Sequence, residues 1–410
     1  MIQSQTTPGQ SDMNASVESA PHVMPIRPAL LTDGPTLQQY GPVLRRLTVG
    51  LLDEVAEINL ICLEPSSFLD FIPSPPVRLF TQAPRTLTVV PKILQRSSRH
   101  VKLITPALPI LERVMPRRLS QRLFSKLAEY KPNLIHALGE SSFLAARQLS
   151  KQLQIPYLIS TLTLGKHTIA YAASRCQGIL SCDAGTTQVL QQQYPSMAQK
   201  IRHLPIGTHV PEDACCFAPV RDRPVIACVT QLDRSPAVGA LIEALVAVKE
   251  AGHRPLLIIA GKGPGEPAVR RLIQELNISG NVQIVPPPPD VIPQNDSLKT
   301  FFGEADIFVL PGRQKYWSPE LLEAMSMGNL AITARESFSD LVTHEKTGLT
   351  ITPGDARQLA QTLIRVLSDP PLARQLARAG QQHVREHFLA SRMVINLTEI
   401  YRQAVMNKSA

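Results

Sequence analysis

Apolar runs alternate with amphipathic stretches through the amino-terminal half of the chain. The apolar runs are bounded by turn residues and predict β-strands; they lie at 28–31, 58–63, 133–138, 157–161 and 178–182. The amphipathic stretches repeat apolar positions three or four residues apart and predict helices; they lie at 36–53, 117–130, 141–153 and 184–193. Strands that alternate with helices pair in parallel through right-handed crossovers.

The same alternation restarts beyond a loop-like stretch at 205–224. The predicted strands of this second half lie at 225–230, 255–261, 282–285, 307–311 and 330–334. The predicted helices lie at 237–251, 267–277, 297–304 and 318–327, followed by a helical tail from Ala356 to about Val405 that is broken at Pro370–Pro371. Two successive α/β units predict two Rossmann-like domains with parallel sheets that face a cleft. Ligands of such sheets bind beyond the carboxyl ends of the strands, so this cleft is the expected site.

Length and composition agree with two domains. The chain has 410 residues and is therefore too long for one ordinary core. Apolar residues make up 44% of it, which is enough for two cores. We predict a disordered leader at 1–24, an N-terminal Rossmann-like domain at 25–210, a linker at 211–219, a C-terminal Rossmann-like domain at 220–387 and a C-terminal helix at 388–410. Since the leader lacks the pattern of a signal peptide and no run of eighteen apolar residues occurs, we expect a cytoplasmic protein.

Positive charge is concentrated in one segment of the first domain. Residues 85–126 hold ten Lys or Arg and one acid, Glu112. The net charge of this segment therefore equals that of the whole chain, +9. Such a stripe predicts peripheral contact with anionic membranes or a phosphorylated acceptor, and a solvated basic face is the alternative. Nucleic acid is not expected, because the stripe lacks interleaved aromatic residues and no recognition motif accompanies it.

Other candidate motifs favour structural roles. The six cysteines show no CxxC or Cys/His spacing, so neither a metal site nor a disulfide framework is predicted. The "GKGPG" stretch at 261–265 has the spacing G-x-G-x-G and predicts a tight turn between a strand and a helix, not a dinucleotide site. His136, at the end of a predicted strand, has no carboxylate partner in the pattern and is expected to be structural.

The stretch "KYWSPELLEAMSMG" at 315–328 has the pattern of a helix whose first turn faces a ligand. Ser318 suits an N-cap and Pro319 suits the first helical position. Glu320 and Glu323 are three residues apart and share one side of the helix. Taken alone, acids in a first turn are explained by the helix dipole.

Together, the motifs of the carboxyl-terminal half resemble those of the GT-B glycosyltransferases of family 4, the glycosyl transferases group 1. The motifs are "IRHLPIGTHV", "QLDRSPAVGALIEAL", "LLIIAGKGP", "FGEADIFVLPG", "WSPELLEAMSMGNLAIT" and "KTGLTITPGDARQLAQTL". The resemblance implies a GT-B fold with an acceptor domain followed by a donor domain, and a C-terminal helix that crosses back to the first domain. It also implies sugar transfer from a nucleotide-diphosphate donor, with retention of configuration and without a metal or other cofactor.

Carried over residue by residue, the resemblance is strongest at Glu323, which takes the place of the family's second glutamate. The first glutamate is replaced by Lys315, and the family's arginine and lysine by Gln231 and Pro236. Ser318 and Gly34 complete the predicted donor-binding set of Glu323, Lys315, Ser318, Gln231 and Gly34. No catalytic residue is assigned.

Two interpretations of the diverged donor site follow. In the first, the chain is a glycosyltransferase of nucleotide sugars and a carbohydrate or lipid-linked acceptor, in which Lys315 takes over phosphate contact. In the second, diphosphate binding is lost, and the chain is an inactive carbohydrate-binding or partner protein. A nucleotide-sugar epimerase of the same architecture is a distant third. We favour the first, because Glu323 and the predicted cleft persist.

Overall fold

The computed structural model describes residues 25–62, 101–104, 124–212, 223–286, 297–335 and 340–407. Gaps inside these ranges fall at 52, 56–57, 125–126, 128–129, 163–171, 173, 234–235 and 315–316. The predicted leader at 1–24, Lys315 and nearly all of the basic stripe at 85–126 lie outside the described residues. The membrane contact expected from the stripe therefore stays a prediction.

The first lobe is built on a seven-stranded sheet in which every pairing is parallel, in the order β3-β2-β1-β4-β5-β6-β7. The strands are β1 Pro28–Thr32, β2 Ile58–Cys62, β3 Val101–Ile104, β4 Leu134–Ala137, β5 Tyr157–Thr161, β6 Cys176–Ser181 and β7 Ile201–His203. The helices are α1 Gly34–Leu51, α6 Glu140–Leu153 and α7 Ala184–Gln193, with a short 3₁₀ turn η2 at Pro195–Lys200. The two edge strands, β3 and β7, are elements that the sequence pattern did not predict.

The second lobe is built on a six-stranded parallel sheet in the order β10-β9-β8-β11-β12-β13. Its strands are β8 Val225–Val229, β9 Leu256–Ala260, β10 Val282–Val285, β11 Ile307–Leu310, β12 Leu330–Ala334 and β13 Leu349–Ile351. Its helices are α8 Pro236–Glu250, α9 Glu266–Glu275, α10 Ser297–Gly303, α11 Pro319–Ser326 and α12 Ala356–Ser368, with a 3₁₀ turn η3 at Ser279–Asn281.

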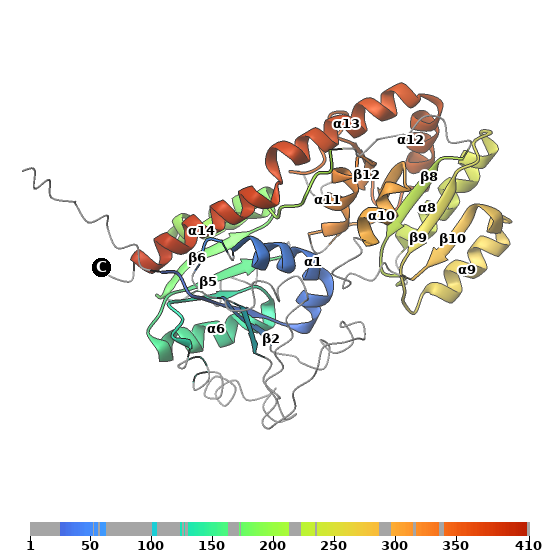
Figure 1. Cartoon of the computed structure of the whole chain (residues 1–410). Helices are drawn as coiled ribbons and strands as arrows, with labels where there is room; N and C mark the ends of the chain where they lie inside the picture. Colours follow the sequence, from blue (N-terminus) through green and yellow to red (C-terminus); the bar gives the residue numbers. More distant parts are fainter. Residues whose placement is uncertain are drawn as a thin grey trace, which may run out of the picture.

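The helical tail links the two lobes. Helix α13 (Pro370–His387) packs against α11, α12 and β12, whereas α14 (Ala390–Met406) packs against α1 and β4 of the first lobe (Figure 1). The tail crosses the linker at Thr208, whose N–H donates to the carbonyl of Phe388 and whose carbonyl accepts from Ala390 N–H, at 2.7 and 3.0 Å. The expected return of the C-terminal helix is confirmed.

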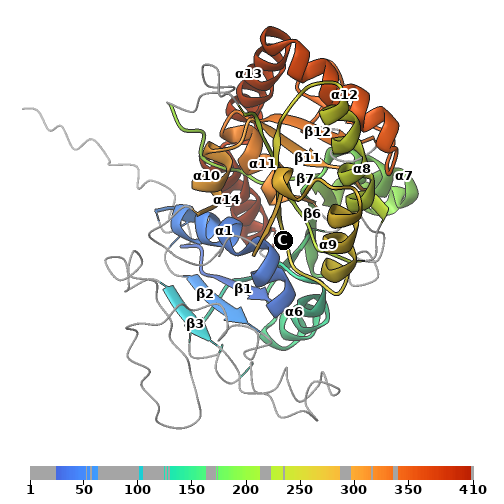
Figure 2. The same cartoon turned by 90° about the vertical axis from the view of Figure 1, so that its right-hand side faces the viewer.

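The alternation of side chains across the strands explains this arrangement. In β1 and β4, Leu30 and Leu134 belong to the face covered by α1 and α14, whereas Ala29, Leu31 and Ile135 belong to the face covered by α6 and α7. This follows from the period of two along a strand. The fold is therefore α/β with two Rossmann-like lobes, as predicted, and Figure 2 shows both sheets with their covering helices.

One apolar core runs from the first lobe into the second. It joins the α1 and α14 face of the first sheet to α10, α11 and α13 of the second lobe, and it includes Leu30, Leu322 and Tyr401. A separate core lies on the other face of each sheet. The predicted domain bounds, including the linker at 211–219 that lies mostly outside the described residues, stay a prediction.

Candidate functional site

The two lobes touch at segments that follow the carboxyl ends of their strands. Leu162 and Asp183 follow β5 and β6 of the first lobe, while Trp317 and Asp340 follow β11 and β12 of the second. This is the edge at which parallel α/β sheets bind their ligands. The candidate site is therefore the boundary between the lobes around the start of α11.

Helix α11 begins as the sequence predicts. Ser318 is its N-cap, because the N–H of Leu321 donates to Ser318 Oγ at 3.2 Å and a proline holds the first helical position. The Ser318 hydroxyl in turn donates to Glu320 Oε2 at 2.8 Å. Burial raises the pKa of Glu320, and the bond from Ser318 opposes that rise.

Trp317, the single tryptophan of the chain, is fully buried at the boundary between the lobes. Its backbone N–H donates to the carbonyl of Leu162 at 3.1 Å. Its own carbonyl accepts from the hydroxyl of Tyr40 on α1, at 2.8 Å. The segment that leads into α11 is thus held by two elements of the opposite lobe.

Glu323 is also buried at this boundary, with 2% of its surface exposed. Its Oε1 lies 2.6 Å from Nη1 of Arg46 on α1, and the Thr208 hydroxyl lies 2.9 Å from both carboxylate oxygens. We expected this carboxylate to face an open cleft. In this structure the carboxylate is covered instead, because α1 of the first lobe packs against α11 and brings Arg46 onto Glu323. The donor-binding role of Glu323 stays a prediction.

Arg46 keeps a part of its guanidinium without a partner. Nε and Nη2 are buried, and neither makes a hydrogen bond to a described residue, although only 13% of the side chain is exposed. Sequence reasoning missed Arg46. A usable signal was its helical spacing from Val43 and Gly50, because Val43 is buried and Gly50 packs against Val394 of α14.

The remaining predicted donor-binding residues lie on other elements. Gln231 is exposed in the loop between β8 and α8, and Pro236 is the exposed first residue of α8. Gly34 is the first residue of α1. Among the described residues, no hydrogen bond or ion pair joins Gln231 or Gly34 to Ser318 or Glu323.

The glycines of the "GKGPG" stretch serve close packing, as predicted. A Cβ at Gly261 would approach the carbonyl oxygen of Thr230 to 2.1 Å, and one at Gly263 would approach that of Leu232 to 2.2 Å. The turn after β9 therefore lies directly against the loop after β8 that carries Gln231. Only glycine allows two backbones to approach so closely.

His136 is structural, as expected. The buried ring lies between two hydroxyls, with Nδ1 2.7 Å from Tyr401 Oη and Nε2 2.7 Å from Ser160 Oγ. Burial lowers the pKa of His136 to about 3, so the ring is neutral. It ties α14 to the first sheet.

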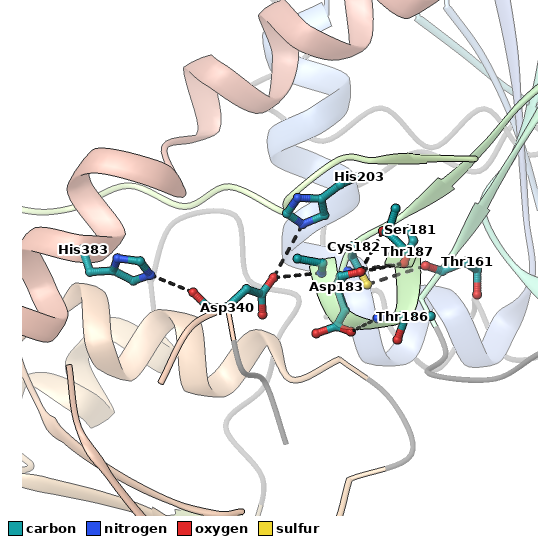
Figure 3. Close-up of polar contacts among 10 residues, drawn as sticks. Thr161, Ser181, Cys182, Asp183, Thr186, Thr187, His203, Asp340 and His383 are labelled. Atoms are coloured by element: carbon teal, nitrogen blue, oxygen red, sulfur yellow. Dashed lines mark hydrogen bonds and ion pairs between the residues drawn. The ribbon is translucent and has the colours of Figure 1, made fainter. Parts of the chain in front are cut away.

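A second polar contact between the lobes was not foreseen, and Figure 3 shows it. Asp183 is the N-cap of α7 and accepts from Thr186 N–H at 2.6 Å. Asp340 of the opposite lobe accepts from Ala184 N–H at 3.4 Å, and its Oδ2 lies 3.5 Å from Nε2 of His203. We call Asp183 and Asp340 the interlobe carboxyl pair. The sequence signal available was a capping position for Asp183 and none for Asp340.

The described residues contain neither a membrane-spanning helix nor a cluster of metal ligands. None of their helices is long and apolar enough to cross a membrane. No group of three or more His, Cys, Asp or Glu side chains among them could hold a metal ion.

Comparison with known sequences points to one family. Residues 217–383 match the family model described as Glycosyl transferases group 1. The chain is 29% identical over 184 residues to the GDP-mannose-dependent monoacylated alpha-(1-6)-phosphatidylinositol monomannoside mannosyltransferase of Corynebacterium glutamicum, which covers 43% of this chain and 46% of that protein. It is 24% identical over 183 residues to the alpha-D-kanosaminyltransferase of Streptomyces kanamyceticus, covering 44% and 46%. These matches span about half the length of the curated relatives.

Comparison with solved structures covers both lobes. A glycosyltransferase from Rickettsia africae superposes with a TM-score of 0.71 and 14% identity, covering 93% of this chain and 99% of that one. Sucrose-phosphate synthase from Thermosynechococcus elongatus gives a TM-score of 0.70 and 20% identity, covering 93% and 100%. At these identities the likeness concerns the fold. The chain is thus a GT-B protein of two Rossmann-like lobes, whose second lobe matches the model of the glycosyl transferases group 1 over residues 217–383.

Proposed function

We propose that the chain is a glycosyltransferase that moves a sugar from a nucleotide-diphosphate donor to a carbohydrate or lipid-linked acceptor, with retention of configuration. The observation that carries the proposal is the family match over 217–383, on a lobe whose α11 begins at the boundary with the other lobe. Relatives whose names specify mannosyl and kanosaminyl transfer support the reaction class.

The second lobe binds the donor in this proposal, and the first lobe binds the acceptor. The first turn of α11 presents the positive end of the helix dipole, which suits a diphosphate. The carboxylate of Glu323 is able to accept hydrogen bonds from the two hydroxyls of a ribose. No metal or other cofactor is part of this proposal.

Arg46 supplies a positive charge to this donor site, where the two positions expected to be cationic hold uncharged residues. The positions expected to carry an arginine and a lysine hold Gln231 and Pro236, which bring no charge. Arg46 contacts Glu323 through Nη1, while its buried Nε and Nη2 have no partner in the part of the chain that the structure describes. These two atoms form the fork with which arginine binds phosphate oxygens.

We propose that donor binding parts the lobes enough for the ribose to take the place of Arg46 on Glu323. The guanidinium then pairs with the diphosphate, whose oxygens gain negative charge as the bond to the sugar breaks. Stabilisation of that charge by a fixed cation lowers the barrier to transfer. Lys315, outside the described residues, is a second candidate for the same contact.

The test is a transfer assay on the purified full chain with UDP- and GDP-sugars and with carbohydrate or lipid-linked acceptors. We expect release of the nucleoside diphosphate that depends on the acceptor, and a product with the anomeric configuration of the donor by NMR. Binding of a nucleotide sugar without turnover would support the inactive alternative. An interconverted donor sugar would instead reveal an epimerase.

A further inference from the structure

The interlobe carboxyl pair brings two buried acids together, and the proposed function assigns no role to either of them. Asp183 is 6% exposed, and the side chain of Asp340 is 9% exposed. The two carboxyls come from opposite lobes, and Asp340 lies so close to the start of α7 that it accepts from the N–H of Ala184, the residue after Asp183 (Figure 3). A hydrogen bond between two carboxyls forms only when one of them carries a proton.

One carboxylate oxygen of Asp340 lacks a hydrogen-bond donor that such a proton would supply. Oδ2 of Asp340 accepts from Ala184 N–H, whereas Oδ1 is buried and has no hydrogen-bond partner among the described residues. On Asp183, Oδ2 is already used by Thr186 N–H. A buried carboxylate oxygen without a donor is costly, and a proton on the facing carboxyl supplies that donor.

We propose that Asp183 and Asp340 share one proton across the boundary between the lobes, and that loss of this proton loosens the contact between the lobes. With the proton present, the pair is a hydrogen bond that carries a single negative charge. Without it, two buried carboxylates repel each other from opposite lobes. The proposal does not depend on the proposed function, because it concerns only the contact between the lobes.

The other titratable groups around the pair come from three further elements. Cys182, at the end of β6, is a neutral thiol, because burial raises its pKa well above the usual range. His203, at the end of β7, lies near Asp340 Oδ2, at 3.5 Å. His383 of α13 donates from Nε2 to the backbone carbonyl of Asp340 at 2.7 Å, so it does not reach the carboxyl oxygens (Figure 3).

The direction of the pH effect follows from the environment of Asp183. Burial raises the pKa of Asp183, the bond from Thr186 N–H lowers it, and the charge of Asp340 raises it again, with a net rise. A carboxyl whose pKa is raised in the folded state contributes stability that is complete at low pH and is lost as the pH rises through that raised value. The contact is therefore tighter below the raised pKa of Asp183 and looser above it.

Trp317 reports on this contact without any substrate, because it is the single tryptophan and is buried between the lobes. Quenching of its fluorescence by acrylamide is measured on the full chain between about pH 4.5 and about pH 8. For the wild type we expect quenching to rise at least about twofold across this range. The amide introduced by Asp340→Asn is a permanent donor to Asp183, so this variant should stay weakly quenched at every pH.

Two further variants keep the test decisive. Asp355 caps α12 away from the boundary and accepts from Gln358 N–H, so Asp355→Asn should quench like the wild type. His203→Gln removes the nearby imidazole and should retain the pH dependence. Loss of the pH dependence in His203→Gln, or an unchanged pH dependence in Asp340→Asn, would overturn the shared proton. Circular dichroism of each variant confirms that the chain is folded.

Discussion

Arg46 and Glu323 are partners from opposite lobes, and the surroundings leave few other ways to satisfy either charge. Both side chains are largely buried, and Thr208 is the further group that contacts the carboxylate. A buried charge that loses its partner costs several kcal/mol, which explains why a long side chain on α1 reaches across the boundary. Two nitrogen atoms of the same guanidinium, Nε and Nη2, have no partner among the described residues, and their free N–H donors are what suggests a phosphate partner.

Replacing Arg46 should separate phosphate recognition from nucleoside recognition. For Arg46→Gln we expect the affinity for a nucleoside diphosphate to fall by a factor of at least about ten, because one charge-assisted hydrogen bond contributes roughly 1.5–3 kcal/mol. The affinity for the nucleoside without phosphates should not fall, because Glu323 stays in place for the ribose and no longer has to part from Arg46. Calorimetry with both ligands measures the difference.

The matched control for this experiment is Arg402→Gln. Arg402 lies on α14, which packs against α1, and it pairs with Glu54 where both side chains are partly exposed. An equal loss of diphosphate affinity in both variants, or equal losses for nucleoside and nucleoside diphosphate in Arg46→Gln, would contradict the phosphate role.

His136 predicts a loss of stability in acid. Its pKa is lowered from 6.5 to about 3 by burial, so the folded state binds this proton less well than the unfolded chain does. A depressed value contributes stability above about pH 6.5 that is lost as the pH falls toward the folded value, by about 1.4 kcal/mol for each pH unit. Urea unfolding between about pH 6.5 and about pH 4.5 should show this slope, and His136→Gln should reduce it.

An exposed histidine provides the comparison. His344 has half of its side chain exposed, so His344→Gln should leave the slope close to that of the wild type. If His136→Gln and the wild type lose stability equally over this range, burial of a neutral ring is not the cause.

At the scale of elements, strand and helix bounds were predictable where periodicity and capping agree. β10 and β12 have the predicted bounds, and α7 begins directly after the capping Asp183. Strands of three or four residues at the sheet edges, such as β7 and β13, carry too few positions for a pattern to emerge. The break between α13 and α14 at 388 and 389 lies at the expected start of the C-terminal helix at 388–410, although neither proline nor glycine marks these two positions.

The crossing of the linker over this break makes a prediction about Gly207. A Cβ there would lie 2.5 Å from the carbonyl oxygen of Leu389 and 2.6 Å from backbone atoms of Ala390, so the two segments would have to move apart. We expect Gly207→Ala to destabilise the protein by roughly 2 kcal/mol or more, measured by urea unfolding. A Cβ at Gly280 meets nothing within 4 Å, so Gly280→Ala is the control and should have little effect.

A result in which Gly207→Ala unfolds at the same urea concentration as Gly280→Ala would show that the crossing tolerates a side chain. The tail would then be held mainly by the contacts of α14 with α1 and β4.

At the scale of the whole molecule, the lobes share one apolar core as well as the polar contacts at their boundary. The core passes from the first sheet through α1 and α14 to α10, α11 and α13. Unfolding of one lobe would expose the core that it shares with the other, so both lobes should unfold in one cooperative transition. Denaturation followed by Trp317 fluorescence, which reports on the boundary, and by far-ultraviolet circular dichroism should give coincident curves.

Separate transitions would show that the shared core contributes less to the free energy of unfolding than the cores within each lobe do. In that case the fluorescence of Trp317 would change at a lower urea concentration than the circular dichroism does, because the boundary would open first.

The sequence by itself determined the two α/β units, the start of α11 and the family resemblance of the second lobe, because these depend on local periodicity, capping and turn residues. The tertiary structure decided which side chains meet between the lobes. Arg46 and Glu323 are 277 positions apart, and Asp183 and Asp340 are 157 apart, so no local pattern links them. Their partnership arises only when two folded sheets bring α1 against α11 and the end of β6 against the segment after β12.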